Sequence, residues 1–218
     1  MSDDDSVDET PDTTPDAAPE VPEVVESPIR GIGTLVFGKW DAAEVTCTDP
    51  GISPYINLKT VGIPHSGGRH ANAWFGKSKL SIVERFINGL MRTGKYTGKK
   101  IAAAKAFEDA LDRIAERDDI NPLQTFVDAV SNAAPMEEIT YIKFGAVRQP
   151  KAADSAPSRR IDVAIRNLAK GSTQATRKST RTLSQGIVNE ISKAASGDVT
   201  SFAVGKKEEV ERIAAAAR

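Results

Sequence analysis

The chain has 218 residues, of which 39% are hydrophobic, and its 29 Lys and Arg nearly balance its 30 Asp and Glu. This length can bury a sizeable core in one domain, and no apolar run approaches the roughly 18 residues of a membrane span. The acidic N-terminus is unlike a secretory signal, and the single cysteine, Cys47, excludes an internal disulfide. We therefore expect a cytoplasmic protein with no membrane partner, no metal and no cofactor.

The N-terminal segment carries a charge of its own. Residues 1–28 hold ten acidic residues and no basic residue, together with Pro, Thr and Ala and few large apolar side chains. Such a segment cannot bury enough apolar surface to offset its ordering entropy, so we predict a disordered acidic tail. The rest of the chain holds 29 basic against 20 acidic residues, which makes it a basic body.

Two further regions follow the tail. Residues 29–77 carry Val, Ile, Phe and Trp between Gly and Pro, which predicts an irregular extension with short strands and a basic loop. Residues 78–218 show helical periodicity, beginning with a stripe from Leu80 to Met91. Ser81 and Glu84 have capping-box spacing, with Ser78 as an alternative cap, and Gly94 is a suitable terminator.

The helical pattern then continues with one interruption. A second helix is predicted over 98–117, with a stripe formed by Ile101, Ala104, Phe107, Leu111 and Ile114, and Asn121-Pro122 opens a third. Alternation over about 138–156 predicts a β-hairpin. Three more helices are expected, from Ser158 to Gly171, over about 178–196 and over 206–218. The predicted fold is mainly α, a bundle of about six helices with an inserted β-hairpin arm and an irregular N-terminal extension.

Positive charge gathers in two blocks. The first block, residues 65–100, holds eight basic residues and one acid, and the second block, residues 143–181, holds ten and two. The segment between them holds three basic and nine acidic residues. Solvated helix faces generally intersperse acids with bases, so two such blocks favour a polyanionic partner, most simply a nucleic acid.

The segment from Ser172 to Thr182 is the most specific part of this charge pattern. Arg177, Lys178 and Arg181 lie at a predicted helix start, where the macrodipole disfavours cations. A phosphate bound by the helix amides, the hydroxyls and these cations would reverse that penalty.

Two motifs resemble catalytic chemistry but favour other interpretations. The segment from Gly89 to Lys95 matches the start of a P-loop, yet Tyr96 stands where Ser or Thr would hold magnesium, and the segment closes a helix. His65 and His70 flank a Gly-rich stretch around Ser66 with no acid to orient a histidine. A basic loop on a sugar–phosphate backbone is the favoured interpretation, and no catalytic residue is assigned.

The order of several segments resembles a known family. The run from Ile82 to Met91, the loop Gly94-Lys95 to Gly98-Lys99-Lys100, Asn121-Pro122-Leu123, Ser158-Arg159-Arg160 and the closing Gly205-Lys206-Lys207-Glu208-Glu209 are similar to small-subunit ribosomal protein seven. Phe37-Gly38-Lys39-Trp40 and Pro64-His65-Ser66 resemble its archaeal and eukaryotic branch specifically. The resemblance to the family covers about residues 35–218 in unbroken order.

The resemblance implies a non-enzymatic primary binder of 16S rRNA that nucleates assembly of the 30S head, in the 3′ major domain near the decoding centre and the tRNA exit site. Its implied partners are 16S rRNA, head proteins of the 30S subunit and, through the hairpin, exit-site tRNA and mRNA. The implied RNA-binding residues are Lys77, Lys79, Arg92, Lys95, Lys99, Lys100, Arg148, Arg159, Arg160, Arg177, Lys178, Arg181, Lys206 and Lys207.

Two features of the chain differ from the family pattern, and two other classes of protein remain as alternatives to this interpretation. The pI of about 6.2 and the acidic tail depart from the family pattern and look haloarchaeal, which would make close phosphate contacts outweigh long-range attraction. The hairpin tip, from Gln149 to Asp154, holds few basic residues for a contact with tRNA. The first rival is a helical DNA-binding regulator, which predicts a helix-turn-helix and sequence preference on duplex DNA; an enzyme ranks third.

Overall fold

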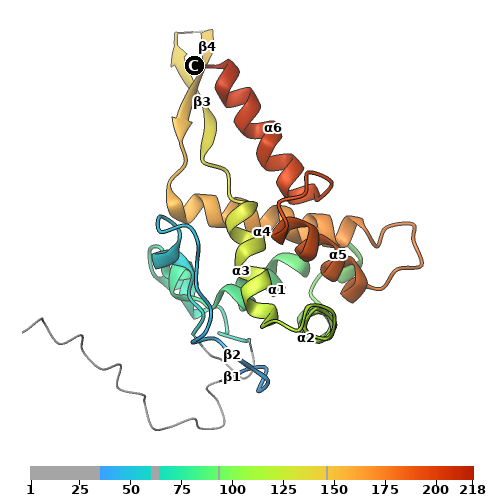
Figure 1. Ribbon diagram of the computed structural model, residues 1–218. Helices are drawn as coiled ribbons and strands as arrows, with labels where there is room; N and C mark the ends of the chain where they lie inside the picture. The colour runs from blue at the N-terminus through green and yellow to red at the C-terminus, as the bar shows by residue number, and fades with distance from the viewer. Residues whose placement is uncertain (1–34, 60–63, 93, 146) are drawn as a thin grey trace, which may run out of the picture. The chain divides into compact units, whose positions relative to one another are not determined.

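The computed structural model describes residues 35–59, 64–92, 94–145 and 147–218, so the tail predicted over 1–28 lies outside the described residues. Figure 1 shows the described chain as a set of helices from which one hairpin extends. The helices are α1 (Ile82–Leu90), α2 (Lys100–Asp118), α3 (Pro122–Asn132), α4 (Pro157–Gln174), α5 (Leu183–Ala195) and α6 (Phe202–Ala216). The strands form two antiparallel pairs, β1 (Leu35–Val36) with β2 (Trp40–Asp41) and β3 (Glu137–Phe144) with β4 (Val147–Asp154). The predicted fold class is confirmed.

Three phenylalanine rings lie at the centre of the core. Phe86 of α1, Phe107 of α2 and Phe126 of α3 are fully buried, and their ring centroids are 5.1–5.4 Å apart. Tilted and edge-to-face pairs at this separation add to the free energy gained by burying the rings. The same buried cluster continues into α4 and α5 through Ile161, Leu168, Ile187 and Ile191. The helices that carry the two basic blocks therefore share one core.

Two helix starts are capped by side chains: Asn121 is the predicted cap of α3, whereas α5 begins at Leu183, later than the predicted start at about residue 178. The Asn121 side chain accepts a hydrogen bond from the backbone N–H of Leu123, and Pro122 occupies the first turn of α3. At α5, the Thr182 side chain and Gln185 form a reciprocal capping box. Each arrangement satisfies backbone N–H groups that the helix itself leaves unpaired.

The predicted capping box of α1 is not formed. Ser81 occupies the N-cap position, but its side chain makes no capping hydrogen bond. The carboxylate of Glu84 instead lies 2.7 Å from the ammonium of Lys100, because a charge-assisted bond to a cation is stronger than one to a neutral N–H. α1 also ends at Leu90, before the predicted terminator Gly94, which begins a 3₁₀ turn, η4 (Gly94–Tyr96).

The stripe predicted for the second helix is wrong at one position. Ile101 is 88% exposed, whereas Ala103 and Phe107 are buried. At 100° per residue, Ile101 lies 240° from Phe107 around the helix, away from the core face. The buried stripe therefore begins two residues later than predicted.

Gly171 does not end its helix as predicted. α4 continues to Gln174, and Gly171 lies where a Cβ atom would come within 2.6 Å of a carboxylate oxygen of Glu190. That carboxylate accepts hydrogen bonds from the Ser201 hydroxyl and the Ala203 N–H at the start of α6. Gly171 is thus required for close packing rather than for termination.

The hairpin is almost fully exposed beyond its base. β3 and β4 pair in register from Glu137 opposite Asp154 to Phe144 opposite Val147, close to the predicted range of 138–156. The predicted tip is wrong, because Gln149 to Asp154 lie within β4 and the strands end at Phe144 and Val147. Phe144 and Val147 are 65% and 67% exposed, and Tyr141 is 63% exposed. Its outer end therefore presents apolar side chains to the surface rather than to the core.

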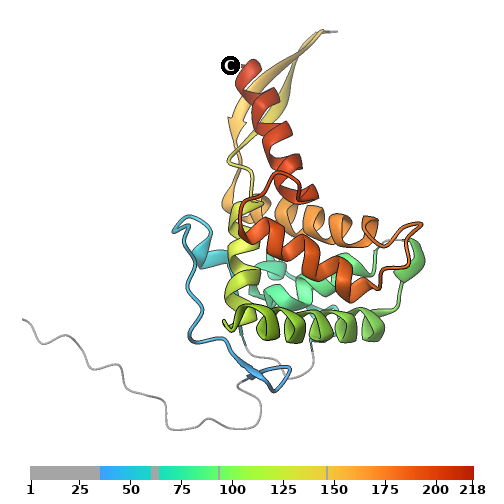
Figure 2. The same cartoon turned by 45° about the vertical axis from the view of Figure 1, so that its right-hand side comes forward.

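α6 runs beside the hairpin. The two lie side by side in Figures 1 and 2, and the Glu211 carboxylate accepts a hydrogen bond from the Met136 N–H at the base of β3 over 2.9 Å. α6 begins at Phe202, four residues before the prediction, because the Ser201 hydroxyl caps it.

The extension before α1 contributes to the core despite its irregular structure. Val36 and Ile52 are buried within it, and the Ile82 N–H donates to the carbonyl of Asn57 over 2.8 Å. Three 3₁₀ turns lie in this region, η1 (Ser53–Tyr55), η2 (Arg69–Asn72) and η3 (Gly76–Lys79).

Candidate nucleic-acid interface

A groove of about 600 Å³ lies between α1 and α4. The helices pack closely because Gly89 has no side chain, and a Cβ atom there would lie 3.2 Å from the Cβ of Ala169. The lining residues include three basic residues of the first block and two of the second, namely Lys77, Arg85, Arg92, Arg166 and Lys170. Among the described residues that line the groove, Asp162 is the only acid.

Asp162 pairs with two of these cations. Its carboxylate lies 2.6 Å from the guanidinium of Arg85, whose side chain is only 7% exposed, and it also pairs with Lys77. The other three cations of the groove are exposed. Within the described ranges, no carboxylate forms a hydrogen bond or ion pair with Arg92, Arg166 or Lys170. The rim of the groove thus keeps its positive charge.

A second hollow, of about 270 Å³, also joins the two blocks. The η4 turn supplies Lys95 and Tyr96, and the connection between α4 and α5 supplies Thr176, Arg177 and Lys178. The Tyr96 hydroxyl donates to the Thr176 hydroxyl over 3.4 Å, so a direct contact holds the two loops together. All three cations of this hollow are exposed.

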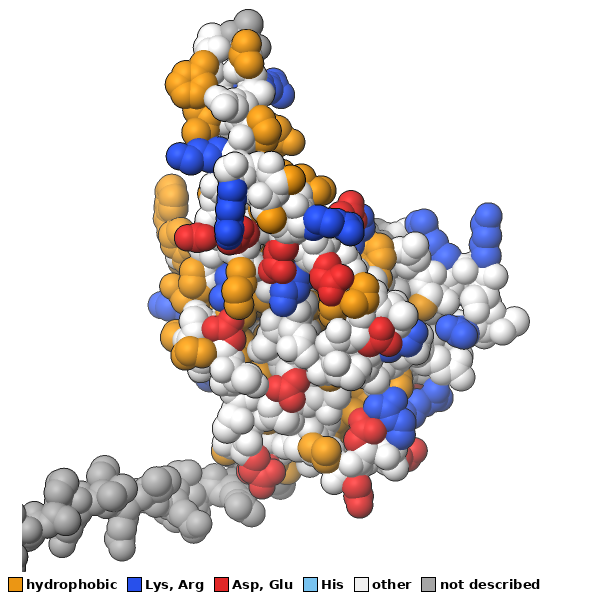
Figure 3. Space-filling model, turned by 45° about the horizontal axis from the view of Figure 1, so that its top comes forward, with side chains coloured by type: hydrophobic (Ala, Val, Ile, Leu, Met, Phe, Trp, Pro, Cys, Tyr) orange, Lys and Arg blue, Asp and Glu red, His pale blue; other side chains and the backbone are white. Residues whose placement is uncertain are grey.

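We call the exposed cations that line the two hollows and form no ion pair with a carboxylate of the described chain the basic face. Its members are Arg92, Lys95, Arg166, Lys170, Arg177 and Lys178. Figure 3 shows Lys and Arg side chains gathered at the edge of the molecule where α4 connects to α5. Because the face draws on both blocks, one polyanion can contact cations that are far apart in the sequence.

The cations before α5 lie in a loop rather than in the helix. α5 begins at Leu183, and Thr182 already caps its first N–H groups. Arg177 and Arg181 are exposed in the preceding connection, and Lys178 has a left-handed backbone conformation with φ of 52°. Their charges therefore lie just outside the helix start, where an anion would also meet the positive end of the α5 dipole.

The implied RNA-binding residues divide by their contacts. Within the described parts of the chain, eight are exposed and form no ion pair with a carboxylate: Lys79, Arg92, Lys95, Lys99, Arg148, Arg177, Lys178 and Arg181. Five pair with an acid, namely Lys77 with Asp162, Lys100 with Glu84, Arg159 with Glu138, Arg160 with Asp49 and Lys206 with Glu209. Lys207 donates to a backbone carbonyl.

Lys100 belongs to a buried network that fixes the Gly-rich loop. Glu84 is 2% exposed and accepts hydrogen bonds from Lys100 and from both the N–H and the hydroxyl of Ser66. Burial would raise the pKa of Glu84, but these donors lower it below its ordinary value. The Ser66 hydroxyl also lies 3.4 Å from Nδ1 of His70. Since the carboxylate contacts the serine and not the histidine, this geometry fixes a loop rather than activating a nucleophile.

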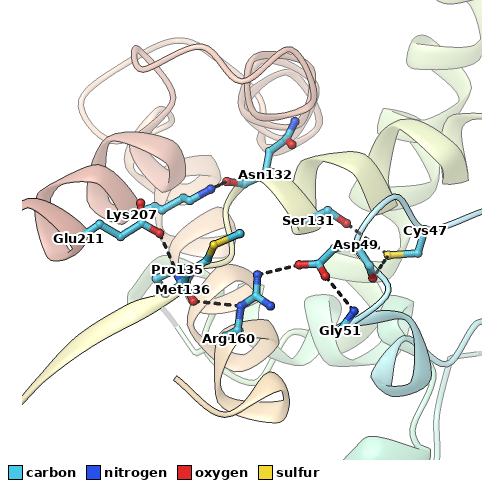
Figure 4. A network of polar contacts seen from close by, with 10 residues as sticks. All are labelled: Cys47, Asp49, Gly51, Ser131, Asn132, Pro135, Met136, Arg160, Lys207 and Glu211. Carbon is cyan, nitrogen blue, oxygen red and sulfur yellow. Dashed lines mark hydrogen bonds and ion pairs between the residues drawn. The ribbon is translucent and has the colours of Figure 1, made fainter. Parts of the chain in front are cut away.

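Arg160, one of the implied RNA-binding residues, is buried. Figure 4 shows its guanidinium between Asp49 and the carbonyl of Pro135, at 2.7 and 3.1 Å. Burial would raise the pKa of Asp49, but the bonds from Arg160 and the Gly51 N–H lower it. The side chain of Arg160 is 11% exposed, so Arg160 joins α4 to the N-terminal extension. No local pattern indicates this ion pair, because Asp49 and Arg160 are 111 residues apart in the sequence.

Lys207 also connects elements of the fold. Its ammonium donates to the Asn132 carbonyl at the end of α3 over 3.0 Å (Figure 4). The Asn132 side chain in turn donates to the carbonyls of Ala194 and Ala195. This chain of bonds joins α6, α3 and α5.

Two members of the basic face are absent from the implied set. Arg166 and Lys170 share the face of α4 opposite Ile161, Ile165 and Leu168, which are buried. Helical spacing alone is the signal that finds them, since residues three and four apart share a face. Tyr96 and Thr176 carry no comparable signal, because their contact joins two loops.

The P-loop-like segment has a different structure from a nucleotide site. Gly89 lies inside α1 and Gly94 begins a 3₁₀ turn, whereas a P-loop joins a strand to a helix. Among the described residues, no group of three or more His, Cys, Asp or Glu side chains is placed to hold a metal ion. None of the described helices is long and apolar enough to cross a membrane.

Comparison with known proteins gives one consistent result. Residues 53–218 match the family model described as ribosomal protein S7p/S5e. Over 184 residues, the chain is 48% identical to the small ribosomal subunit protein uS7 of Archaeoglobus fulgidus, covering 84% of this chain and 95% of that protein. Over 183 residues it is 49% identical to uS7 of Methanothrix thermoacetophila, covering 84% of this chain and 99% of that protein. The chain therefore belongs to the ribosomal protein S7p/S5e family.

Proposed function

We propose that the basic face binds folded 16S rRNA and that the chain is a structural, non-enzymatic constituent of the small ribosomal subunit. Family membership and the names of the relatives support the place in the subunit. The bound RNA would be the 3′ major domain, where the protein nucleates assembly of the 30S head beside its neighbouring head proteins. These details rest on the family resemblance and on the charge of the surface.

One observation carries the RNA-binding proposal. Both hollows are lined by cations from both basic blocks, and Asp162 is the only acid among their described lining residues. Phosphates supply most of the affinity of proteins for nucleic acids, and folded RNA is recognised largely through its shape, phosphates and sugars. A continuous cationic face with hydroxyl and amide donors beside it suits that mode of recognition.

The implied residues contribute unequally in this proposal. The eight exposed cations that form no ion pair within the described chain are the direct phosphate contacts. Lys77, Lys100, Arg159, Lys206 and Lys207 must share or exchange their present partners to reach RNA, and Arg160 holds the scaffold.

A filter-binding titration with a transcript of the 3′ major domain tests the proposal. Reversing Arg92 and Arg177 together to Glu should weaken binding about a hundredfold or more and flatten the dependence of log K on log salt by about two phosphate contacts. The matched control reverses Lys105 and Arg113 on α2. Both are exposed, and they change net charge equally without lining either hollow.

The two pairs of variants separate specific contact from net charge. The proposal expects the α2 control to retain affinity within a few-fold. Equal losses in both would contradict a defined face. Duplex DNA serves as competitor, and preferential binding of duplex DNA would favour the regulator instead.

The hairpin and the tail are separate parts of the proposal. Lys143 and Arg148 are opposite each other near the hairpin end, beside exposed Tyr141 and Phe144, which suits a contact with exit-site tRNA or mRNA. Deleting the hairpin end should then remove that contact while the 3′ domain stays bound. Deleting residues 1–28, which repel phosphate by charge, should leave RNA affinity equal or higher.

A further inference from the structure

Two adjacent aromatic rings stand out at the surface beside the groove. Trp74 is 95% exposed and Phe75 is 72% exposed, and neither ring packs on another aromatic ring within the described residues. Exposing two large neighbouring rings forgoes the free energy that their burial would supply. Neither the basic face nor the core accounts for them.

The backbone around the two rings is held in place. Phe75 has a left-handed conformation with φ of 53°, and its carbonyl accepts hydrogen bonds from both the N–H and the hydroxyl of Ser78. A Cβ atom at Gly76 would lie 2.2 Å from the carbonyl oxygen of His70, so only glycine allows this close turn. The turn therefore presents the aromatic pair on a fixed backbone, which lowers the entropy lost on binding a ligand.

The pair also adjoins the proposed RNA-binding groove. Trp74 and Phe75 line a hollow of about 450 Å³ together with His70 and Lys77, and these last two residues also line the groove between α1 and α4. A strand whose phosphates follow the groove would thus reach the aromatic pair without leaving the surface.

We infer that Trp74 and Phe75 form a stacking platform for an unpaired base of the RNA that occupies the groove. Bases stack on exposed aromatic rings whatever their identity, and sequence-specific RNA recognition uses such unstacked bases. Lys77 at the edge of the hollow suits an adjoining phosphate better than it suits an apolar protein surface. The inference rests on the proposed function, since the groove must carry RNA.

Tryptophan fluorescence tests the platform directly. The chain has two tryptophans, Trp40 and Trp74, so Trp40→Phe in the full chain leaves Trp74 as the only indole. Titrating this variant with the 3′ major domain transcript should quench its fluorescence along the binding curve, because a stacked base quenches indole emission. Polyphosphate is the control ligand, since it offers the same charge without bases and should leave the emission largely unchanged.

Affinity supplies the second readout. Trp74→Ala should weaken binding of the transcript about tenfold, whereas Trp74→Phe should restore most of it, because stacking needs a flat ring. Because the Trp74 side chain is exposed, both variants should keep their helices, and far-UV circular dichroism measures whether they do.

The outcomes separate this inference from the proposed function. The platform would be overturned if Trp74 fluorescence were not quenched and Trp74→Ala bound the transcript as tightly as the unmodified chain. If Arg92→Glu with Arg177→Glu still abolished binding in that case, the proposed function would stand. A platform that instead binds a neighbouring protein would give that same result. Failure of the unmodified chain to bind the transcript would overturn both.

Discussion

The basic residues of this chain form two groups that differ in what lies against them. In the paired seam, Arg85, Lys100 and Arg160 are largely buried and each contacts a carboxylate from a distant segment. On the basic face, the cations are exposed and contact no carboxylate of the described chain. The same residue types thus serve the fold in one region and remain available to a partner in the other.

The few acids of the basic blocks pair mainly with cations of the paired seam. Glu84 is the only acid of the first block and Asp162 is one of two in the second, and both are taken up by the paired seam. Asp162 also pairs with the exposed Lys77, but within the described residues neither acid forms an ion pair with a cation of the basic face. The basic face is therefore more positive than the charge count of either block suggests.

The largest effect on stability is expected from Arg160→Met. This change keeps the apolar stem but leaves Asp49 without its cation and the Pro135 carbonyl without its donor. Breaking a buried pair on one side costs about 3 kcal/mol or more of the free energy of unfolding. Urea denaturation measures this loss, and a decrease in the free energy of unfolding below about 1 kcal/mol would show that Arg160 does not stabilise the fold as a buried ion pair.

A smaller, pH-dependent loss in the free energy of unfolding is expected from Glu84→Gln. The amide keeps the shape but loses the charge that holds Lys100 and Ser66, at a cost of about 2 kcal/mol near neutral pH. Because the folded-state pKa of Glu84 is lowered, its contribution is complete above the ordinary value of 4.5 and is lost as pH falls through the folded-state pKa.

The stability difference between the unmodified chain and Glu84→Gln should therefore shrink at acid pH. Asp49 and Glu138, whose pKa values are also lowered, remain in both proteins and cancel in that difference. A difference that stays constant from neutral to acid pH would show that the charge of Glu84 does not stabilise the fold.

Arg159→Ala should have the smallest effect on stability. Arg159 precedes Arg160 in the sequence and also pairs with a carboxylate, but its side chain is 65% exposed. Exposed pairs of this kind contribute less than about 1 kcal/mol. Thermal unfolding beside Arg160→Met provides the comparison, and similar losses in the two variants would mean that burial does not distinguish the groups.

Most of the fold could be predicted because its signals are local. Helical periodicity, the cap at Asn121 and the alternation of the strands depend on neighbouring residues, so the helices and the hairpin follow from the sequence. The predicted starts of α5 and α6 are misplaced although their caps, Thr182 and Ser201, are local signals, whereas several other differences depend on a remote contact or on helix phase. From the sequence alone Gly171 is predicted to end its helix, because its contact with Glu190 cannot be seen there. Glu84 is predicted to be part of a capping box for the same reason, since its ion pair with Lys100 is a tertiary contact.

The candidate site was predictable only in part, for the same reason. Charge density and helical spacing identify Arg92, Lys95 and Arg177 as candidates, since exposure on a helix face or in a loop is a local property. Whether a cation forms an ion pair with an acid depends on the tertiary structure. Arg160 and Arg92 therefore cannot be distinguished from the sequence alone. The joining of the two loops by Tyr96 and Thr176 has no sequence signature.

Directed hydroxyl-radical cleavage tests most directly whether both basic blocks contact one RNA site. In a Cys47→Ser background, iron chelates attached at Thr97→Cys and Ser179→Cys mark the two blocks without removing any cation, and Glu116→Cys on α2 is the control. If both blocks contact one RNA site, the first two probes should cleave overlapping nucleotides of the 3′ major domain and the control should not. Cleavage by these two probes in separate regions of the RNA would contradict a single face built from both blocks.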